Sequence, residues 1–372
     1  MMGISDLKSD RSWAKARGRL SRHLKPRIEG RIPGGVPGTV VRSLVEQLYR
    51  PEITRHVTSM HAELPARIDR YPLDPGLPAW FRREKALDPV YLYDVLDVVV
   101  SPSTGLAWFE DESLALQESV GSLQRLTGWD NSLWETNRRP VTGPQFAVVL
   151  PWTGFFHFLL ESLPSFIRSL RYADASAAVV VPKDRPAIID EILRHLGVAD
   201  ERIVAASRPL RLRRHVFTGL PPYSGFVQPS DIQLLKTSIS SSLASNVAGR
   251  EDIYVSRKNT PRRALDNENE LERHLAAKGF QVVYAERMSF QEQIEVFRRA
   301  RTVVAPHGAG LANLIWCEGP SKVIEVFAHG MHNDCYARLA VSLGSRYTPI
   351  SCSPCPPTAG RIDVSAVLEA AL

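Results

Sequence analysis

A basic loop in the second half of the chain carries the first residues that could do chemistry. Four cations fall within seven residues there, at Arg257, Lys258, Arg262 and Arg263. Guanidinium groups offer paired N–H donors whose spacing matches two phosphate oxygens. A solvated surface loop would also tolerate four cations, but this loop follows a short apolar strand. Because ligands bind at the carboxyl ends of parallel strands, we predict that the loop binds phosphate.

A second candidate anion site is the turn His307-Gly308-Ala309-Gly310, which follows a short apolar run and Pro306. Glycines let backbone N–H groups approach a phosphate, and the start of the next helix favours negative charge. His307 is expected to bond a phosphate or ribose, or to orient the loop. The turn lacks the lysine of a P-loop, and it lacks the third glycine and spaced acid of a dinucleotide fingerprint. A nucleotide-like ligand other than NAD is therefore favoured.

Two polar residues on an otherwise apolar helix could supply acid–base chemistry. His157 and Glu161 are four residues apart, so they share one helix face. The helix follows the apolar strand Phe146–Leu150, which would place the pair at the mouth of a sheet. A carboxylate or imidazole there could take a proton from an acceptor hydroxyl. A pair on the helix surface is the structural alternative.

An acid also lies within the apolar run Val323–Phe327, where Glu325 stands among valine and isoleucine. A buried carboxylate costs free energy unless it is paired or hydrogen-bonded. Ribose hydroxyls are the functional partners to expect, and a structural salt bridge is the alternative.

Alternating strands and helices are predicted to position these residues. In the second half, strands are expected at Ile253–Arg257, Gln281–Tyr284, Thr302–Ala305, Lys322–Phe327 and Arg346–Ile350, and helices at Asn267–Lys278, Ser289–Arg299, Gly310–Trp316 and Asn333–Leu343. A similar pattern begins near Gln145. Alternating elements with apolar strands indicate parallel, doubly wound sheets. We therefore predict an α/β fold with two Rossmann-like domains that face a cleft. Before Gln145, a helix is expected at Glu112–Thr127.

Composition and charge narrow the class of protein. The chain has 372 residues, of which 44% are hydrophobic, and a net charge of +6, which is ordinary for a globular protein of two domains. Residues 1–50 hold eleven Lys/Arg and four Asp/Glu, so the remainder sums to −1. We interpret this basic segment as a solvated tail, with a helix on an anionic membrane surface as the alternative. No nucleic-acid-binding motif accompanies it, so nucleic acid is not expected as a partner.

Taken together, these motifs resemble those of glycosyltransferase family 61. The resemblance rests on Ser256-Arg257, on Arg262-Arg263-Ala264-Leu265-Asp266-Asn267-Glu268, on the turn His307–Asn313 and on Val323-Ile324-Glu325-Val326. The segment His157…Glu161…Pro164 is also similar to an upstream motif of the family. The resemblance spans residues 145–330, and the His-Gly-Ala-Gly-Leu turn is its most specific part.

The resemblance implies a GT-B fold, a nucleotide-sugar donor held mainly by the C-terminal domain, and inversion at the anomeric carbon. The diphosphate ligands that it implies are Ser256, Arg257, Arg262, Arg263, His307, Gly308, Ala309 and Gly310, and Asn313 and Glu325 would contact the donor sugar or nucleoside. Glu161, or His157 in its place, would be the base. Such fixed cations would offset the charge on the leaving diphosphate, so neither a metal nor another cofactor is expected.

The expected activity is therefore transfer of a hexosyl or pentosyl group to a hydroxyl of a glycan or lipid-linked acceptor, in surface or capsular polysaccharide synthesis. A non-catalytic module that binds a glycan or nucleotide is one alternative. An NAD-dependent enzyme that modifies nucleotide sugars is another. The sequence shows neither a secretory signal nor an apolar run long enough to span a membrane. We expect a cytoplasmic protein, with peripheral contact to the inner membrane face through the basic N-terminus as an option.

The expected domain boundaries follow clusters of proline and glycine. Residues 1–38 would form the basic, flexible N-terminal segment. Residues 39–229 would form a Rossmann-like acceptor domain, and 230–350 a Rossmann-like nucleotide-sugar domain. Residues 351–372 would add a C-terminal tail and helix.

Overall fold

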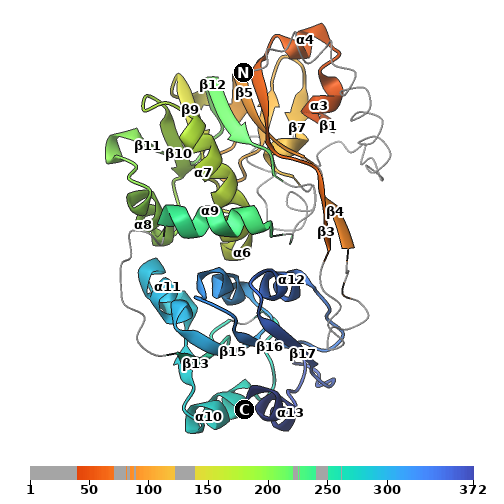
Figure 1. Cartoon of the computed structure of the whole chain (residues 1–372). Coiled ribbons are helices and arrows are strands. Elements are labelled where there is room, and N and C mark those ends of the chain that lie inside the picture. Colours follow the sequence, from red (N-terminus) through yellow and green to blue (C-terminus); the bar gives the residue numbers. More distant parts are fainter. Residues whose placement is uncertain are drawn as a thin grey trace. The chain divides into compact units, whose positions relative to one another are not determined.

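The computed structural model describes residues 40–70, 81, 84–87, 89–121, 139–220, 225, 227–239, 250–260 and 262–372. The predicted basic segment, residues 1–38, lies outside this description. Within it, the chain forms two compact units (Figure 1). The first runs to Ile68 and includes Ala86–Pro186 and Gly197–Ser224. The second comprises Asp69–Lys85, Ala187–Leu196 and Gly225–Leu372.

The second unit is built on a five-stranded, wholly parallel sheet of the order β14-β13-β15-β16-β17. The strands are β13 (Glu251–Val255), β14 (Gln281–Val283), β15 (Ala300–Pro306), β16 (Lys322–Phe327) and β17 (Arg346–Ser351). The predicted parallel sheet is confirmed here, since every strand has been found close to its expected residues. The first strand along the chain, β13, lies between the second and the third. The direction of winding therefore reverses between β13 and β15, and ligands bind at such a switch point.

Helices cover both faces of this sheet. They are α10 (Glu268–Ala277), α11 (Phe290–Arg298), α12 (Cys335–Ser342) and α13 (Val364–Ala371). Figure 1 shows α10 and α13 on one face and α11 and α12 on the other. The predicted capping box at the start of α11 is present, because Ser289 accepts from the N–H of Glu292 and Glu292 accepts from Ser289. Leu271 and Leu275 of α10, one helical turn apart, pack into the core of the unit.

The first unit is built on a ten-stranded sheet that is mixed, so the prediction of a wholly parallel sheet is wrong for this part of the chain. Its main path is β1-β7-β6-β5-β12-β9-β10-β11, with β2 and β8 beside it. The strands are β1 (Val40–Arg42), β2 (Val57–Leu64), β5 (Val90–Val100), β6 (Ala107–Phe109), β7 (Leu114–Leu116), β8 (Val141–Thr142), β9 (Phe146–Val149), β10 (Ala178–Pro182), β11 (Ile203–Ala206) and β12 (Leu210–Thr218). A separate pair joins β3 (Arg67–Arg70) and β4 (Glu84–Leu87).

Connection length explains the mixture of strand directions. Strands β9, β10 and β11 run parallel, and helices connect β9 to β10 and β10 to β11. Short loops join β5 to β6 and β6 to β7, and these pairs are antiparallel. A parallel crossover needs a dozen or more residues, so such loops can only turn the chain back.

The prediction of a helix at Glu112–Thr127 is wrong for the part of this segment that the structure describes, which ends at residue 121. Strand β7 and a short 3₁₀ turn, Gln117–Ser119, occupy this segment. The carboxylate of Glu118 accepts from the N–H of Leu44 at 2.9 Å and from the hydroxyl of Ser43. It thereby binds the start of α3 (Leu44–Gln47). Burial raises the pKa of Glu118. Tertiary pairing has overridden the local helical pattern here.

A bent helical segment follows β9 in the first unit. It consists of α6 (Phe155–His157), the π-helical turn η3 (Phe158–Ser162) and α7 (Leu163–Tyr172). Pro164 lacks an N–H, and its ring would clash with the carbonyl of Leu160 in a regular α-helix. The wider π turn avoids that clash, and π turns are frequent at functional sites. The remaining α-helices of the described residues are α4 (Pro51–Thr54), α8 (Ala187–His195) and α9 (Pro229–Ile239). None of the helices described is long and apolar enough to cross a membrane.

Candidate functional site

The two predicted anion-binding segments lie side by side in the second unit. Arg257 follows β13 and His307 follows β15, on either side of the switch point of the sheet. The Nη1 group of Arg257 donates to the backbone carbonyl of His307. Its Nη2 group donates to the carbonyl of Arg262 at 3.1 Å. One guanidinium therefore joins the basic loop to the glycine turn.

Three arginines concentrate positive charge at this place. Burial, and then the charge of Arg263, lower the pKa of Arg257. Burial, and then the charge of Arg262, lower the pKa of Arg263. Like charges that repel one another in a half-buried position favour the binding of an anion. Lys258, the fourth cation of the loop, instead forms a 2.5 Å ion pair with Glu272.

Arg263 also has a strained backbone. Its φ of 61° lies in the left-handed region, which costs free energy for a residue with a side chain. Its Nε is buried and has no hydrogen-bond partner in the part of the chain that the structure describes. Its Nη1 lies 3.7 Å from the sulfur of Met331. A guanidinium held in this way retains hydrogen-bonding capacity for a ligand.

A buried carboxylate fixes the start of the basic loop. Glu268 accepts from the hydroxyl of Tyr254 at 3.2 Å, the hydroxyl of Ser256 at 3.3 Å and the backbone N–H of Arg257 at 2.5 Å. The Ser256 hydroxyl also lies 3.0 Å from Glu272. Ser256 was predicted to bind the diphosphate, but it is buried against these carboxylates. Sequence reasoning gave Glu268 no role, although it stands in the Asn267-Glu268 pair that the family pattern includes.

Gly308 marks the closest approach between the two segments. A Cβ at this position would lie 2.6 Å from Cδ and 2.8 Å from Nε of Arg257. The φ of Gly308 is −177°, an extended conformation that any residue adopts. Glycine is therefore needed here for space and not for its backbone freedom.

His307 sits in a buried network of three neighbouring strands. Its Nδ1 is hydrogen-bonded to Oε1 of Glu325 on β16, and the hydroxyl of Tyr347 on β17 donates to Oε2 at 2.5 Å. Glu325 is completely buried. Because Glu325 has no exposed surface, a contact with a ribose, as predicted from the sequence, would require the residues that cover it to move. The structural alternative, a paired buried acid, is what the geometry shows.

Asn313 is buried as well. It lies in the 3₁₀ turn η7 (Ala309–Trp316), which covers the whole of the predicted helix Gly310–Trp316. Its Nδ2 donates to Oε1 of Gln293 on α11 at 2.8 Å. Among the described residues its Oδ1 has no hydrogen-bond partner. The bond to Gln293 ties η7 to α11 and thereby helps to fix the position of Gly308–Gly310 at the start of η7.

The predicted acid–base pair is formed in the first unit. His157 and Glu161 are joined by a 2.8 Å bond between Nδ1 and Oε2. The side chain of Glu161 is 1% exposed and that of His157 is 15% exposed. Gly154, with a φ of 95°, turns the chain from β9 into α6. The arrangement is a carboxylate that orients an imidazole, and the imidazole is the more accessible partner.

Residues 155–324 match the family model described as Glycosyltransferase 61. This match, which covers slightly less than half of the chain, supports glycosyltransferase family 61. The match supports glycosyltransferase activity, as predicted from the motifs. None of the curated proteins matches the chain significantly.

The family 61 match runs through both units, from the start of α6 to β16. It includes His157, Glu161, Arg257 and His307, and it ends one residue before Glu325. Tyr336 and Tyr347, which also contact the His307 network, lie beyond it. Sequence reasoning missed both tyrosines, because an isolated tyrosine outside a recognised motif gives no signal of its own.

Proposed function

We propose that this protein is a family 61 glycosyltransferase that takes a sugar from a nucleotide-sugar donor and transfers it, with inversion, to a hydroxyl of a glycan or lipid-linked acceptor. The observation that carries the proposal is the junction of Arg257 with the carbonyl of His307. It brings three arginines and a glycine turn to the switch point of a parallel sheet, where nucleotide ligands bind.

In the donor site, Arg257, Arg262 and Arg263 bind the diphosphate together with His307 and the backbone N–H groups of residues 308–310. Charge-assisted bonds of this kind are stronger than neutral ones. Their donors are fixed before the reaction, so they stabilise the charge that develops on the leaving diphosphate. The donor therefore needs no metal in this proposal. Ser256 and Glu268 support the loop and do not touch the phosphates.

In the acceptor step, His157 removes the proton from the acceptor hydroxyl, and Glu161 orients the imidazole and stabilises its charged form. The acceptor oxygen forms a bond to the anomeric carbon of the donor. The bond between that carbon and the diphosphate oxygen breaks, and its electron pair leaves with the diphosphate. His157 rather than Glu161 is assigned as the base because its side chain is the more exposed of the two.

The same proposal includes a GT-B arrangement of the two units and a place in surface or capsular polysaccharide synthesis. Both come from the family resemblance. A cytoplasmic location belongs with them, and contact of residues 1–38 with the inner membrane face is the alternative to a solvated tail.

A panel of nucleotides tests the donor site directly. Nucleoside diphosphates should raise the midpoint of thermal unfolding, because a ligand that binds only the folded state stabilises it by about 2.7 kcal/mol at 100 times its Kd. The matching nucleoside monophosphates should raise it much less, since they lack the second phosphate. Equal shifts from monophosphates and diphosphates, or no shift from any nucleotide, would contradict a diphosphate site. Release of diphosphate from a stabilising nucleotide sugar would argue against a non-catalytic binding module.

The space at Gly308 allows a second test. Gly308→Ala should push the Arg257 side chain out of place and weaken binding of inorganic pyrophosphate by about tenfold, the loss expected from one impaired charge-assisted bond. Calorimetric titration measures this, and denaturant unfolding should change little, because the displaced atoms belong to a side chain. Gly344→Ala is the matched control. Gly344 has a φ of 69° and no neighbour near a Cβ, so this variant should lose stability and keep its affinity. Unchanged affinity in Gly308→Ala would contradict the assignment.

A further inference from the structure

The imidazole of His307 is held by a chain of two hydrogen bonds that crosses three adjacent strands. His307 follows β15, Glu325 lies on β16 and Tyr347 lies on β17. Tyr347 pairs in register with Val323, two residues before Glu325, so both side chains lie on the same face of the sheet. The carboxylate of Glu325 bonds Nδ1 of His307 through one oxygen and the Tyr347 hydroxyl through the other.

The chemistry of these groups fixes where the protons lie. Burial, and then the charge of Glu325, raise the pKa of Tyr347, so its hydroxyl keeps its proton and donates it. An ionised carboxylate is only an acceptor. With Glu325 present as the carboxylate, its bond to Nδ1 needs the ring proton on Nδ1. Within the described residues Nε2 of His307 makes no hydrogen bond.

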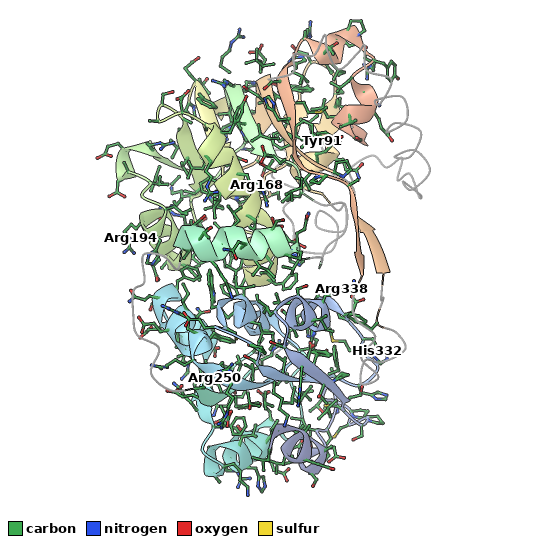
Figure 2. All side chains as sticks on the ribbon, in the orientation of Figure 1. Tyr91, Arg168, Arg194, Arg250, His332 and Arg338 are labelled. Atoms are coloured by element: carbon green, nitrogen blue, oxygen red, sulfur yellow. The ribbon has the colours of Figure 1, made fainter. Side chains whose placement is uncertain are left out.

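Aromatic side chains fix the plane of the ring. Phe327 stacks on His307 at a centroid distance of 5.3 Å and an angle of 25°. The ring of Tyr336 on α12 lies 5.3 Å away and is tilted by 59°. Helix α12 is itself anchored by Arg338, which lies on it in Figure 2. The guanidinium of Arg338 is buried, pairs with Asp334 at 2.5 Å and lies 5.2 Å from the centre of the Phe81 ring.

We infer that Glu325 and Tyr347 are positioning residues that keep the neutral imidazole of His307 protonated on Nδ1 and leave Nε2 as the ring atom that meets the donor diphosphate. The inference rests on the proposed function for the role of Nε2, but not for the position of the proton. A histidine side chain free in water carries its neutral proton mainly on Nε2, so the network reverses the ordinary preference. A second proton must then bind on Nε2, where it can be donated to a phosphate oxygen.

Nitrogen NMR of the ligand-free protein tests the proton position. The protein is labelled with ¹⁵N-histidine and studied near pH 8.5, about two units above the ordinary histidine pKa of ~6.5. His307→Gln identifies the signals by their loss. In the wild type Nδ1 should have the shift of a protonated ring nitrogen and Nε2 that of an unprotonated one. Glu325→Gln should favour the opposite form, because the Tyr347 hydroxyl takes the amide oxygen and leaves the NH₂ group to donate to Nδ1.

Titration with inorganic pyrophosphate tests the role of Nε2. Glu325→Gln should weaken its binding about tenfold, and Tyr347→Phe by a smaller factor. Tyr347→Phe keeps the ring and tests the network if Glu325→Gln does not fold. An Nε2-protonated ring in the wild type, an unaltered ring in Glu325→Gln, or wild-type affinity in both variants would overturn the inference. If the wild type shows the Nδ1 proton but binds neither pyrophosphate nor nucleotides, the proposed function fails and the proton position stands.

Discussion

Replacing Arg257 by alanine should reduce the affinity for nucleoside diphosphates by about 10- to 150-fold. Arg257 is the residue that joins the basic loop to the His307 turn. Hydrogen bonds to charged groups contribute about 1.5–3 kcal/mol each, and removing this guanidinium removes a phosphate ligand and the junction together. Calorimetric titration with the nucleoside diphosphate that stabilises the protein most measures the loss.

Two further variants separate charge from geometry. Arg257→Lys should recover only part of the affinity, because an ammonium cannot form two parallel bonds to a phosphate. Arg273→Ala is the matched control. This arginine lies exposed on α10 and, among the residues that the structure describes, donates only to the carbonyl of Asn269 at 3.4 Å, so its loss should leave binding unchanged. Wild-type affinity in Arg257→Ala would remove this residue from the donor site.

Replacing His157 by alanine should lower turnover by about 10²- to 10⁴-fold, the usual contribution of a general base. Donor affinity should stay near that of the wild type, because His157 belongs to the first unit and the diphosphate site to the second. Turnover is measured as the release of nucleoside diphosphate from the nucleotide sugar that binds best.

Glu161→Gln keeps the size of the side chain and removes its charge. Turnover should fall here too, because the imidazole loses the group that orients it. The double variant should be little worse than His157→Ala alone, since two residues that act as a unit are not additive. If His157→Ala keeps near-normal turnover and Glu161→Gln is inactive, then Glu161 is the base and His157 is not. Normal turnover in both would place the base elsewhere.

Local sequence signals were sufficient for the second unit. Its apolar runs end at polar or small residues, and the predicted strand Lys322–Phe327 matches β16 residue by residue. Gly279 has a φ of 88° at the end of α10, as its place after a helix predicts. The order of the strands could not be read in this way. It depends on which crossovers pack on which face of the sheet, and only that order shows why Arg257 and His307 meet.

The sequence did not predict the features that depend on pairing with residues distant in the chain. Leu114–Leu116 forms a strand because β6 and β1 pair with it, and no property of the three residues alone indicates this. Glu325 was recognised as a buried acid, but its partners come from the turn after β15 and from β17. Tyr347 is 22 residues away from Glu325 in the chain. Long-range pairs of this kind become visible only when the strands are brought together.

A structure of the protein bound to the nucleoside diphosphate that stabilises it most tests the central claim directly. We expect both phosphates within hydrogen-bonding distance of the Arg257 guanidinium and of the backbone N–H groups of residues 308–310, with Nε2 of His307 facing a phosphate oxygen. A diphosphate bound away from the carboxyl ends of β13 and β15 would contradict this account.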